Sequence, residues 1–143
     1  ILAQALYDNT RKDGKRAGRI ISLDAKADWA TVTRGTLPKH LVPQCEIRHV
    51  PAIKEDRGSD LGFHYKHLPD GTPDFLYVDG PALQPGRKIC FDALYLEARF
   101  RPNFFMVVDG RYNTVRYLRE HLTKTYRVTR NYWLHNTQFD LLS

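Results

Sequence analysis

Three aspartates each follow a short apolar segment, and they are the residues in this sequence best suited to chemistry. The apolar runs 20–23, 75–78 and 104–108 end at Asp24, Asp79 and Asp109. If these runs are parallel strands, the carboxylates lie at the strand ends where open α/β sheets bind ligands. A carboxylate at Asp24 can accept hydrogen bonds from both hydroxyls of a ribose. A turn or helix-capping role is the alternative for each aspartate alone, but the recurrence of the pattern favours a binding site.

Arg111 and Tyr112 directly follow Asp109 and Gly110. If the sheet prediction holds, both side chains face the same ligand-binding edge, because they begin the connection that leaves the strand. They could hold an anionic or hydroxylated substrate, and the alternative is a solvated loop.

Histidines and cysteines give no metal-binding pattern. His64 and His67 are separated by two residues, and Cys45 and Cys90 are far apart in the chain. A zinc site would need further ligands, and the spacing supplies none. We therefore predict no metal site and two free, buried thiols in a reducing compartment, the cytoplasm.

Two similar strands must position the aspartates. Residues 73–80 and 103–110 are both near-continuous apolar runs that end in Asp-Gly, a pattern typical of strands buried on both faces. A turn-forming connection at residues 81–86 and a helix at residues 88–100 separate them. The pattern predicts a strand–helix–strand unit with parallel strands.

The first half of the chain predicts a second strand–helix–strand unit. We expect a helix over residues 1–11, a strand over 18–24, and a strand near the sheet edge over 45–50. Asp24 or Asp28 could cap the intervening helix, which carries Trp29. Residues 53–73 are rich in Asp, Gly, Lys and His and show no regular pattern. The stretch is long for a loop without structure, so we expect it to be functional or to hold a short helix.

The C-terminal part predicts one helix and a hairpin. The apolar stripe of residues 113–122 indicates a helix capped by Asn113 or Thr114. Residues 126–142 alternate on both sides of a short polar turn, as an antiparallel hairpin does. Trp29 and Trp133 are expected to be packing residues. The element order predicts an α/β fold, with a mostly parallel sheet and a C-terminal antiparallel hairpin.

Composition is that of an ordinary globular domain. The chain has 143 residues, 42% hydrophobic and 27% charged, with a net charge of +6. A positive net charge permits an anionic partner, but most of the basic residues are scattered along the chain. One run is clustered, and we interpret it as a solvated loop: Arg11, Lys12, Lys15, Arg16 and Arg19. No apolar run is long enough to span a bilayer, so we expect no membrane partner.

The order of these segments resembles class I S-adenosylmethionine-dependent methyltransferases. In that family the second strand ends in an acidic residue that binds the ribose of the cofactor, and Asp24 stands at that position, followed by Ala25. The fourth strand often ends in Asp-Gly, as at Asp79, and the sheet ends in an antiparallel hairpin. The resemblance implies a Rossmann-like sheet with helices on both faces and S-adenosylmethionine as the cofactor.

The beginning of the chain departs from the family pattern. Ile1 is not preceded by a methionine and already lies in a helical pattern. The family's first strand and glycine-rich turn would come before this helix. The resemblance therefore predicts that residues 1–143 form a single methyltransferase-like domain truncated at its N-terminus.

Methyl transfer proceeds by in-line displacement, so positioning of the two reactants does most of the work. The resemblance implies Asp24, Ala25 and Asp79 as cofactor contacts and Asp79 as the catalytic residue. Asp109 is a predicted substrate contact, as are the Arg111 and Tyr112 side chains. The predicted acceptor is a small molecule or a sugar.

Two other classes of function stay open. A nicotinamide-dependent oxidoreductase also carries an acidic residue after the second strand. A non-enzymatic binding or structural module of a larger protein is the other alternative, and an RNA or DNA ligand is one form of it. A salt-dependent affinity for nucleic acid would support that form.

Overall fold

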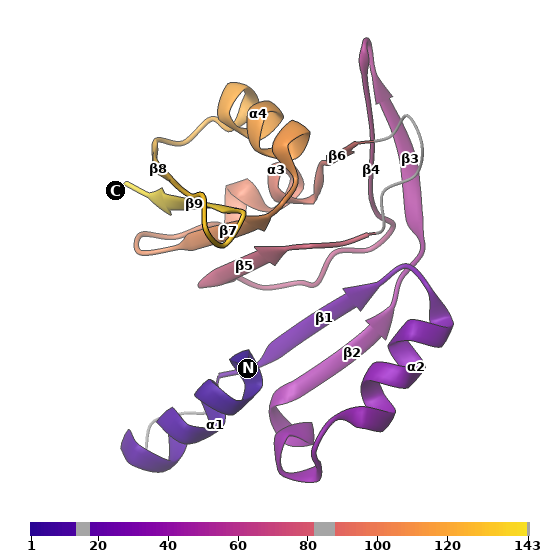
Figure 1. Cartoon of the computed structure of the whole chain (residues 1–143), viewed down its shortest axis with the longest axis vertical. Helices are drawn as coiled ribbons and strands as arrows, with labels where there is room; N and C mark the ends of the chain where they lie inside the picture. The colour runs from indigo at the N-terminus through magenta and orange to yellow at the C-terminus, as the bar shows by residue number, and fades with distance from the viewer. Residues whose placement is uncertain (14–17, 82–87, 143) are drawn as a thin grey trace. The chain divides into compact units, whose positions relative to one another are not determined.

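The computed structural model describes residues 1–13, 18–81 and 88–142, which form two compact units, 1–51 and 52–143 (Figure 1). The predicted connection 81–86 lies almost entirely outside the described residues, as do Lys15 and Arg16 of the basic run. None of the described helices is long and apolar enough to cross a membrane.

The first unit is built on two parallel strands. Its elements are α1 (Leu2–Asp13), β1 (Ile20–Asp24), α2 (Ala27–Thr36), the 3-10 helix η1 (Lys39–Gln44) and β2 (Cys45–His49). β1 and β2 pair in parallel from Ile20↔Cys45 to Asp24↔His49. The predicted helix at residues 1–11 and the predicted strands at 18–24 and 45–50 are confirmed.

Helix α2 buries a small residue and exposes its large ones. Ala30 is fully buried, whereas Trp29 is 62% exposed and Val32 is also exposed. The prediction that Trp29 is a packing residue is wrong, because the buried face of α2 carries Ala30 and Trp29 lies on an exposed face. Neither predicted aspartate stands at the N-cap, which is Lys26.

The second unit begins with a hairpin that the sequence did not predict. β3 (Ala52–Arg57) and β4 (Asp60–Tyr65) are antiparallel, and β4 pairs in parallel with the short β6 (Ile89–Cys90). The turn between β3 and β4 contains Gly58, whose φ of +65° suits glycine. Residues 53–73 were expected to form a functional loop or to hold a short helix. As far as Tyr65 they form strands instead, so the expected helix is wrong there.

The second sheet contains the two similar strands. β5 (Phe75–Val78) and β7 (Phe105–Asp109) pair in parallel, and β8 (Tyr126–Asn131) and β9 (Asn136–Leu141) follow as an antiparallel hairpin. β9 lies between β7 and β8, so the strand order is β5-β7-β9-β8. The predicted parallel pair and the predicted terminal hairpin are both confirmed.

Three helical elements accompany this sheet: α3 (Asp92–Leu96), the 3-10 helix η2 (Glu97–Arg99) and α4 (Tyr112–His121). The helix expected over residues 88–100 is thus shorter, since its first residues form β6. Arg111 stands at the N-cap of α4 in place of the expected Asn113 or Thr114. Thr114 is buried instead, and its hydroxyl accepts a hydrogen bond from the Cys90 N–H at 3.1 Å.

The core of the second unit lies on one face of this sheet. Val78, Met106, Val108 and Phe139 from the strands pack with Leu118 of α4. Alternate residues of β5 and β7 point the other way, and Tyr77 is 47% exposed. The expectation that these two strands are buried on both faces is wrong.

The predicted fold class is also wrong. The expected Rossmann-like fold has one mostly parallel sheet with helices on both faces. The described residues instead form a two-stranded parallel sheet, the mixed sheet β3-β4-β6 and the mixed sheet β5-β7-β9-β8. The hairpins β3–β4 and β8–β9 add antiparallel pairs to the two larger sheets. These sheets are therefore mixed and not mostly parallel, and the fold is a mixed α/β fold.

Candidate functional site

Asp79 and Asp109 lie at one edge of the second sheet. Val78 of β5 pairs in parallel with Val108 of β7, so the residues that follow them lie side by side at the ends of the two strands. Asp79 is exposed, and Asp109 is half-buried. The structure thus brings together the two carboxylates that the sequence placed at strand ends. We call this the β5–β7 edge.

Tyr77 orients the Asp109 carboxylate. The Tyr77 hydroxyl donates a hydrogen bond to Asp109 Oδ2 at 2.7 Å. That hydrogen bond, with partial burial and the charges of Asp109 and Asp79, raises the pKa of Tyr77 to about 12. The phenol is therefore protonated at neutral pH and donates to the carboxylate. Asp109 retains unused acceptor capacity, because an ionised carboxylate has about four lone-pair sites.

Arg111 joins the two strand ends. Its Nη2 group donates a hydrogen bond to the main-chain carbonyl of Asp79. Its Nε and Nη1 atoms are buried and have no hydrogen-bond partner among the described residues. A buried N–H group without a partner costs about 1–3 kcal/mol. The guanidinium therefore carries spare donors at the β5–β7 edge, which suits an anionic or hydroxylated ligand.

Tyr112 contributes an aromatic ring at the start of α4. It is exposed, and the Arg130 guanidinium carbon lies 4.4 Å from its ring centroid. Gly110 separates this helix from β7 with a φ of +58°, and its N–H donates to the His135 carbonyl at 2.8 Å. The turn of the β8–β9 hairpin is thereby fixed beside the end of β7.

Asp24 and Ala25 belong to the first unit. Asp24 ends β1, and its Oδ1 accepts a hydrogen bond from the Lys26 N–H at 2.8 Å. From the sequence, a turn role was the alternative to ribose binding for Asp24, and this hydrogen bond is of that kind. Its Oδ2 has no partner in the described part of the chain, so the carboxylate can still accept hydrogen bonds from a ligand. Ala25 is half-buried in the bend that follows.

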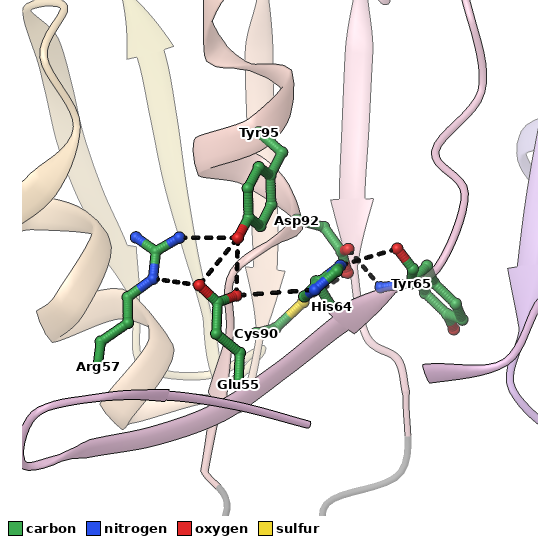
Figure 2. Close-up of polar contacts among 7 residues, drawn as sticks. All are labelled: Glu55, Arg57, His64, Tyr65, Cys90, Asp92 and Tyr95. Carbon is green, nitrogen blue, oxygen red and sulfur yellow. Dashed lines mark hydrogen bonds and ion pairs between the residues drawn. The ribbon is translucent and has the colours of Figure 1, made fainter. Parts of the chain in front are cut away.

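A second group of polar side chains gathers around Glu55, and the sequence interpretation missed it (Figure 2). The Glu55 carboxylate accepts hydrogen bonds from Arg57 Nε at 2.6 Å and from the Tyr95 hydroxyl at 2.8 Å. His64 Nε2 lies 3.8 Å from Glu55 Oε2. Partial burial alone would raise the pKa of Glu55, but these hydrogen bonds and the nearby positive charges lower it.

Asp92 and Cys90 form the buried end of the same group. Asp92 accepts hydrogen bonds from the Tyr65 N–H at 2.8 Å and from the Cys90 thiol at 2.9 Å (Figure 2). Burial raises the pKa of Asp92, and burial with the Asp92 charge raises the pKa of Cys90 well above its usual value. Cys90 is thus a buried, protonated thiol and is poorly suited to act as a nucleophile. Both Cys45 and Cys90 are free, as predicted, and Cys45 is half-buried.

His64 and His67 line an open cleft of about 490 Å³, together with Lys66, Tyr95 and Arg99. The His64 Nδ1 atom lies 2.9 Å from the Tyr65 carbonyl, which requires a proton on Nδ1. No group of three or more metal-ligating side chains occurs among the described residues.

One feature of the sequence could have revealed the Glu55 group. Ile53, Glu55 and Arg57 are two residues apart, so they share one face of a strand. The Gly58 turn and the residues after it complete a hairpin pattern. Asp92 and Tyr95 offered no comparable pattern, because only the pairing of β4 with β6 brings them to the hairpin.

Comparison of the chain with protein-family models gives no match, and comparisons with curated proteins and with solved structures give none either.

Proposed function

We propose that this protein transfers a methyl group from S-adenosylmethionine to a small hydroxylated acceptor. One observation carries the proposal: the in-register parallel pairing of β5 with β7 puts Asp79 and Asp109 at one edge, where Arg111 has spare donors. Two carboxylates and a cation at the ends of parallel strands form a suitable site for a hydroxylated ligand.

Each residue has a distinct role in the proposal. The family resemblance assigns the ribose of the cofactor to Asp24 and Ala25 of the first unit, where the free Asp24 oxygen accepts hydrogen bonds from the ribose hydroxyls. At the β5–β7 edge, Asp79 accepts the proton that the acceptor hydroxyl loses. Asp109, Arg111 and Tyr112 hold the acceptor. When bound, S-adenosylmethionine supplies a methyl group activated for direct displacement, so the protein contributes mainly orientation.

Calorimetry with S-adenosylmethionine tests the cofactor part of the proposal. We expect binding to the intact protein and at least tenfold weaker binding by Asp24→Ala, because the ribose loses its acceptor. Asp28→Ala is the matched control, since Asp28 is exposed on α2 four residues away, and it should bind as the wild type does. Heat with NAD in place of S-adenosylmethionine would favour an oxidoreductase, and no heat with either would contradict both.

Transfer of a labelled methyl group to a panel of sugars and phenols tests the catalytic part. Asp79→Asn should lower turnover about 10²-fold while leaving cofactor affinity unchanged, because general-base catalysis contributes about 10²–10⁴-fold. Equal turnover by wild type and Asp79→Asn would contradict the role of Asp79.

A further inference from the structure

An apolar, aromatic turn projects from the β8–β9 hairpin, and no described part of the chain covers it. Its three residues are Tyr132, Trp133 and Leu134, which are 71%, 94% and 65% exposed. The turn is ordered by a hydrogen bond from the Leu134 N–H to Asn131 Oδ1 at 3.0 Å. Hairpin turns are ordinarily polar, so three consecutive exposed apolar residues indicate a binding function. We call these residues the aromatic turn.

Arginine links the aromatic turn to α4. The Arg130 guanidinium carbon lies 4.4 Å from the ring centroid of Tyr112 and 4.7 Å from that of Tyr132. This cation–π contact holds two exposed rings in place around one positive charge. The prediction that Trp133 is a packing residue is therefore wrong: it is the most exposed member of an aromatic surface.

A groove is lined by residues of α4 and β8, which are labelled in Figure 1. Near the C-terminal end of α4 it encloses about 230 Å³, and its lining includes Leu118, Arg119, Lys124, Tyr126 and Val128. At the other end of α4, Tyr112 contacts Arg130 of β8, so the two elements adjoin there as well. Tyr112 and Arg119 are about 10 Å apart along the helix axis, at 1.5 Å per residue.

Three arginines of α4 and β8 have no carboxylate partner among the described residues. They are Arg116, Arg119 and Arg130, whereas Arg57 and Arg127 pair with Glu55 and Asp140. Arg116 and Arg119 follow Tyr112 by four and seven residues, so all three share one face of α4. Two carboxylates lie near these arginines and Lys124: Glu120, which is exposed, and Glu97, which is buried and accepts hydrogen bonds from the Lys124 N–H and the Tyr126 hydroxyl. Positive charge therefore predominates.

We propose that the α4–β8 groove and the aromatic turn together bind single-stranded nucleic acid. Unpaired arginines in and beside a groove can neutralise phosphates, and exposed Tyr and Trp rings can stack on bases whatever their sequence. A bilayer surface is flat and cannot follow a groove, which favours a flexible polyanion over an anionic membrane. No such patch was predicted from the sequence, because these arginines are scattered along the chain and only the fold brings them together. This inference does not depend on the proposed methyl transfer.

Fluorescence anisotropy with labelled 12-nucleotide oligo(U) and oligo(dT) tests the inference. We expect affinity to fall as salt rises, with a slope of log K against log salt of about −2, because three neutralised phosphates each contribute about −0.7. Tighter binding of oligo(U) than of oligo(dT) would identify RNA as the partner, and equal binding would identify single strands in general. Binding without salt dependence would overturn the inference.

Matched variants locate the site. Trp133→Ala should weaken binding at least fivefold, whereas Trp29→Ala, which removes the other exposed tryptophan from the first unit, should not. Arg119→Gln should make the salt slope shallower by about 0.7, whereas Lys54→Gln on β3 should leave it unchanged. Equal effects of the two tryptophan variants, or binding of phosphatidylserine vesicles but of neither oligonucleotide, would overturn the proposal.

Discussion

At the scale of residues, this protein places charged groups beside partners that decide their protonation. Tyr77 donates to Asp109 and keeps its proton to high pH, whereas Glu55 is held ionised by Arg57 and Tyr95. Asp92 shows the opposite effect, since burial raises its pKa. The carboxylates suited to bind a ligand are therefore the ones at the β5–β7 edge, where hydrogen-bonding capacity remains.

Tyr77 gives a prediction on pH dependence. Its folded pKa is raised to about 12, so its hydrogen bond stabilises the protein fully below the unfolded value of about 10. This contribution is lost as the pH rises from about 10 to 12. In an absorbance titration of tyrosinate, the difference between wild type and Tyr77→Phe should show one group that ionises near pH 12. Ionisation of that group near pH 10 would contradict the hydrogen bond.

At the scale of elements, the turns after the strands determine where the site residues lie. Gly110 allows the chain to leave β7 with a φ of +58°, and its N–H holds the β8–β9 turn through the His135 carbonyl. Arg111 and Tyr112 come next and begin α4 at the same edge. The predicted substrate contacts therefore depend on one left-handed glycine.

Two glycine substitutions with opposite expected effects test this view. Gly110→Ala should destabilise the protein by about 1 kcal/mol or more, because a left-handed φ is unfavourable for residues with a Cβ atom. Gly35→Ala should stabilise it by about 0.5–1 kcal/mol, since Gly35 lies in α2 with open space around an added Cβ. Chemical denaturation measures both. A stabilising Gly110→Ala would show that this turn is not constrained.

At the scale of the whole molecule, the chain consists of two compact units with unequal cores. The second unit has an extended core around Met106, Leu118 and Phe139. In the first unit the buried hydrophobic residues are few, mainly Ala3, Ala30, Leu41 and Val50. Because stability depends on buried apolar area, the two units should differ in their ability to fold alone.

Separate expression of the two units tests this difference. A fragment of residues 52–143 should unfold cooperatively and show dispersed amide resonances, because its core comes from its own elements. A fragment of residues 1–51 should not unfold cooperatively, since single cores of this size are marginal. A disordered 52–143 fragment would contradict the assignment of its core.

Local patterns in the sequence determined most elements and the candidate residues of the β5–β7 edge. Alternation and apolar runs predicted the strands β1, β2, β5 and β7 and the terminal hairpin. The two Asp-Gly endings predicted the parallel pairing of β5 with β7, which places Asp79 beside Asp109. Amphipathic spacing likewise predicted α1 and α4. These features depend on neighbouring residues, so a single sequence can reveal them.

Only the tertiary structure decided the fold class and the groups assembled from distant segments. The β3–β4 hairpin pairs with β6, which brings Glu55 beside Tyr95 and makes the sheet mixed instead of parallel. The packing of α4 beside β8 places Arg119 at the α4–β8 groove and Arg130 against the Tyr112 ring, next to the exposed aromatic turn. Such contacts join residues far apart in the chain, and local periodicity carries no information about which distant segments will meet.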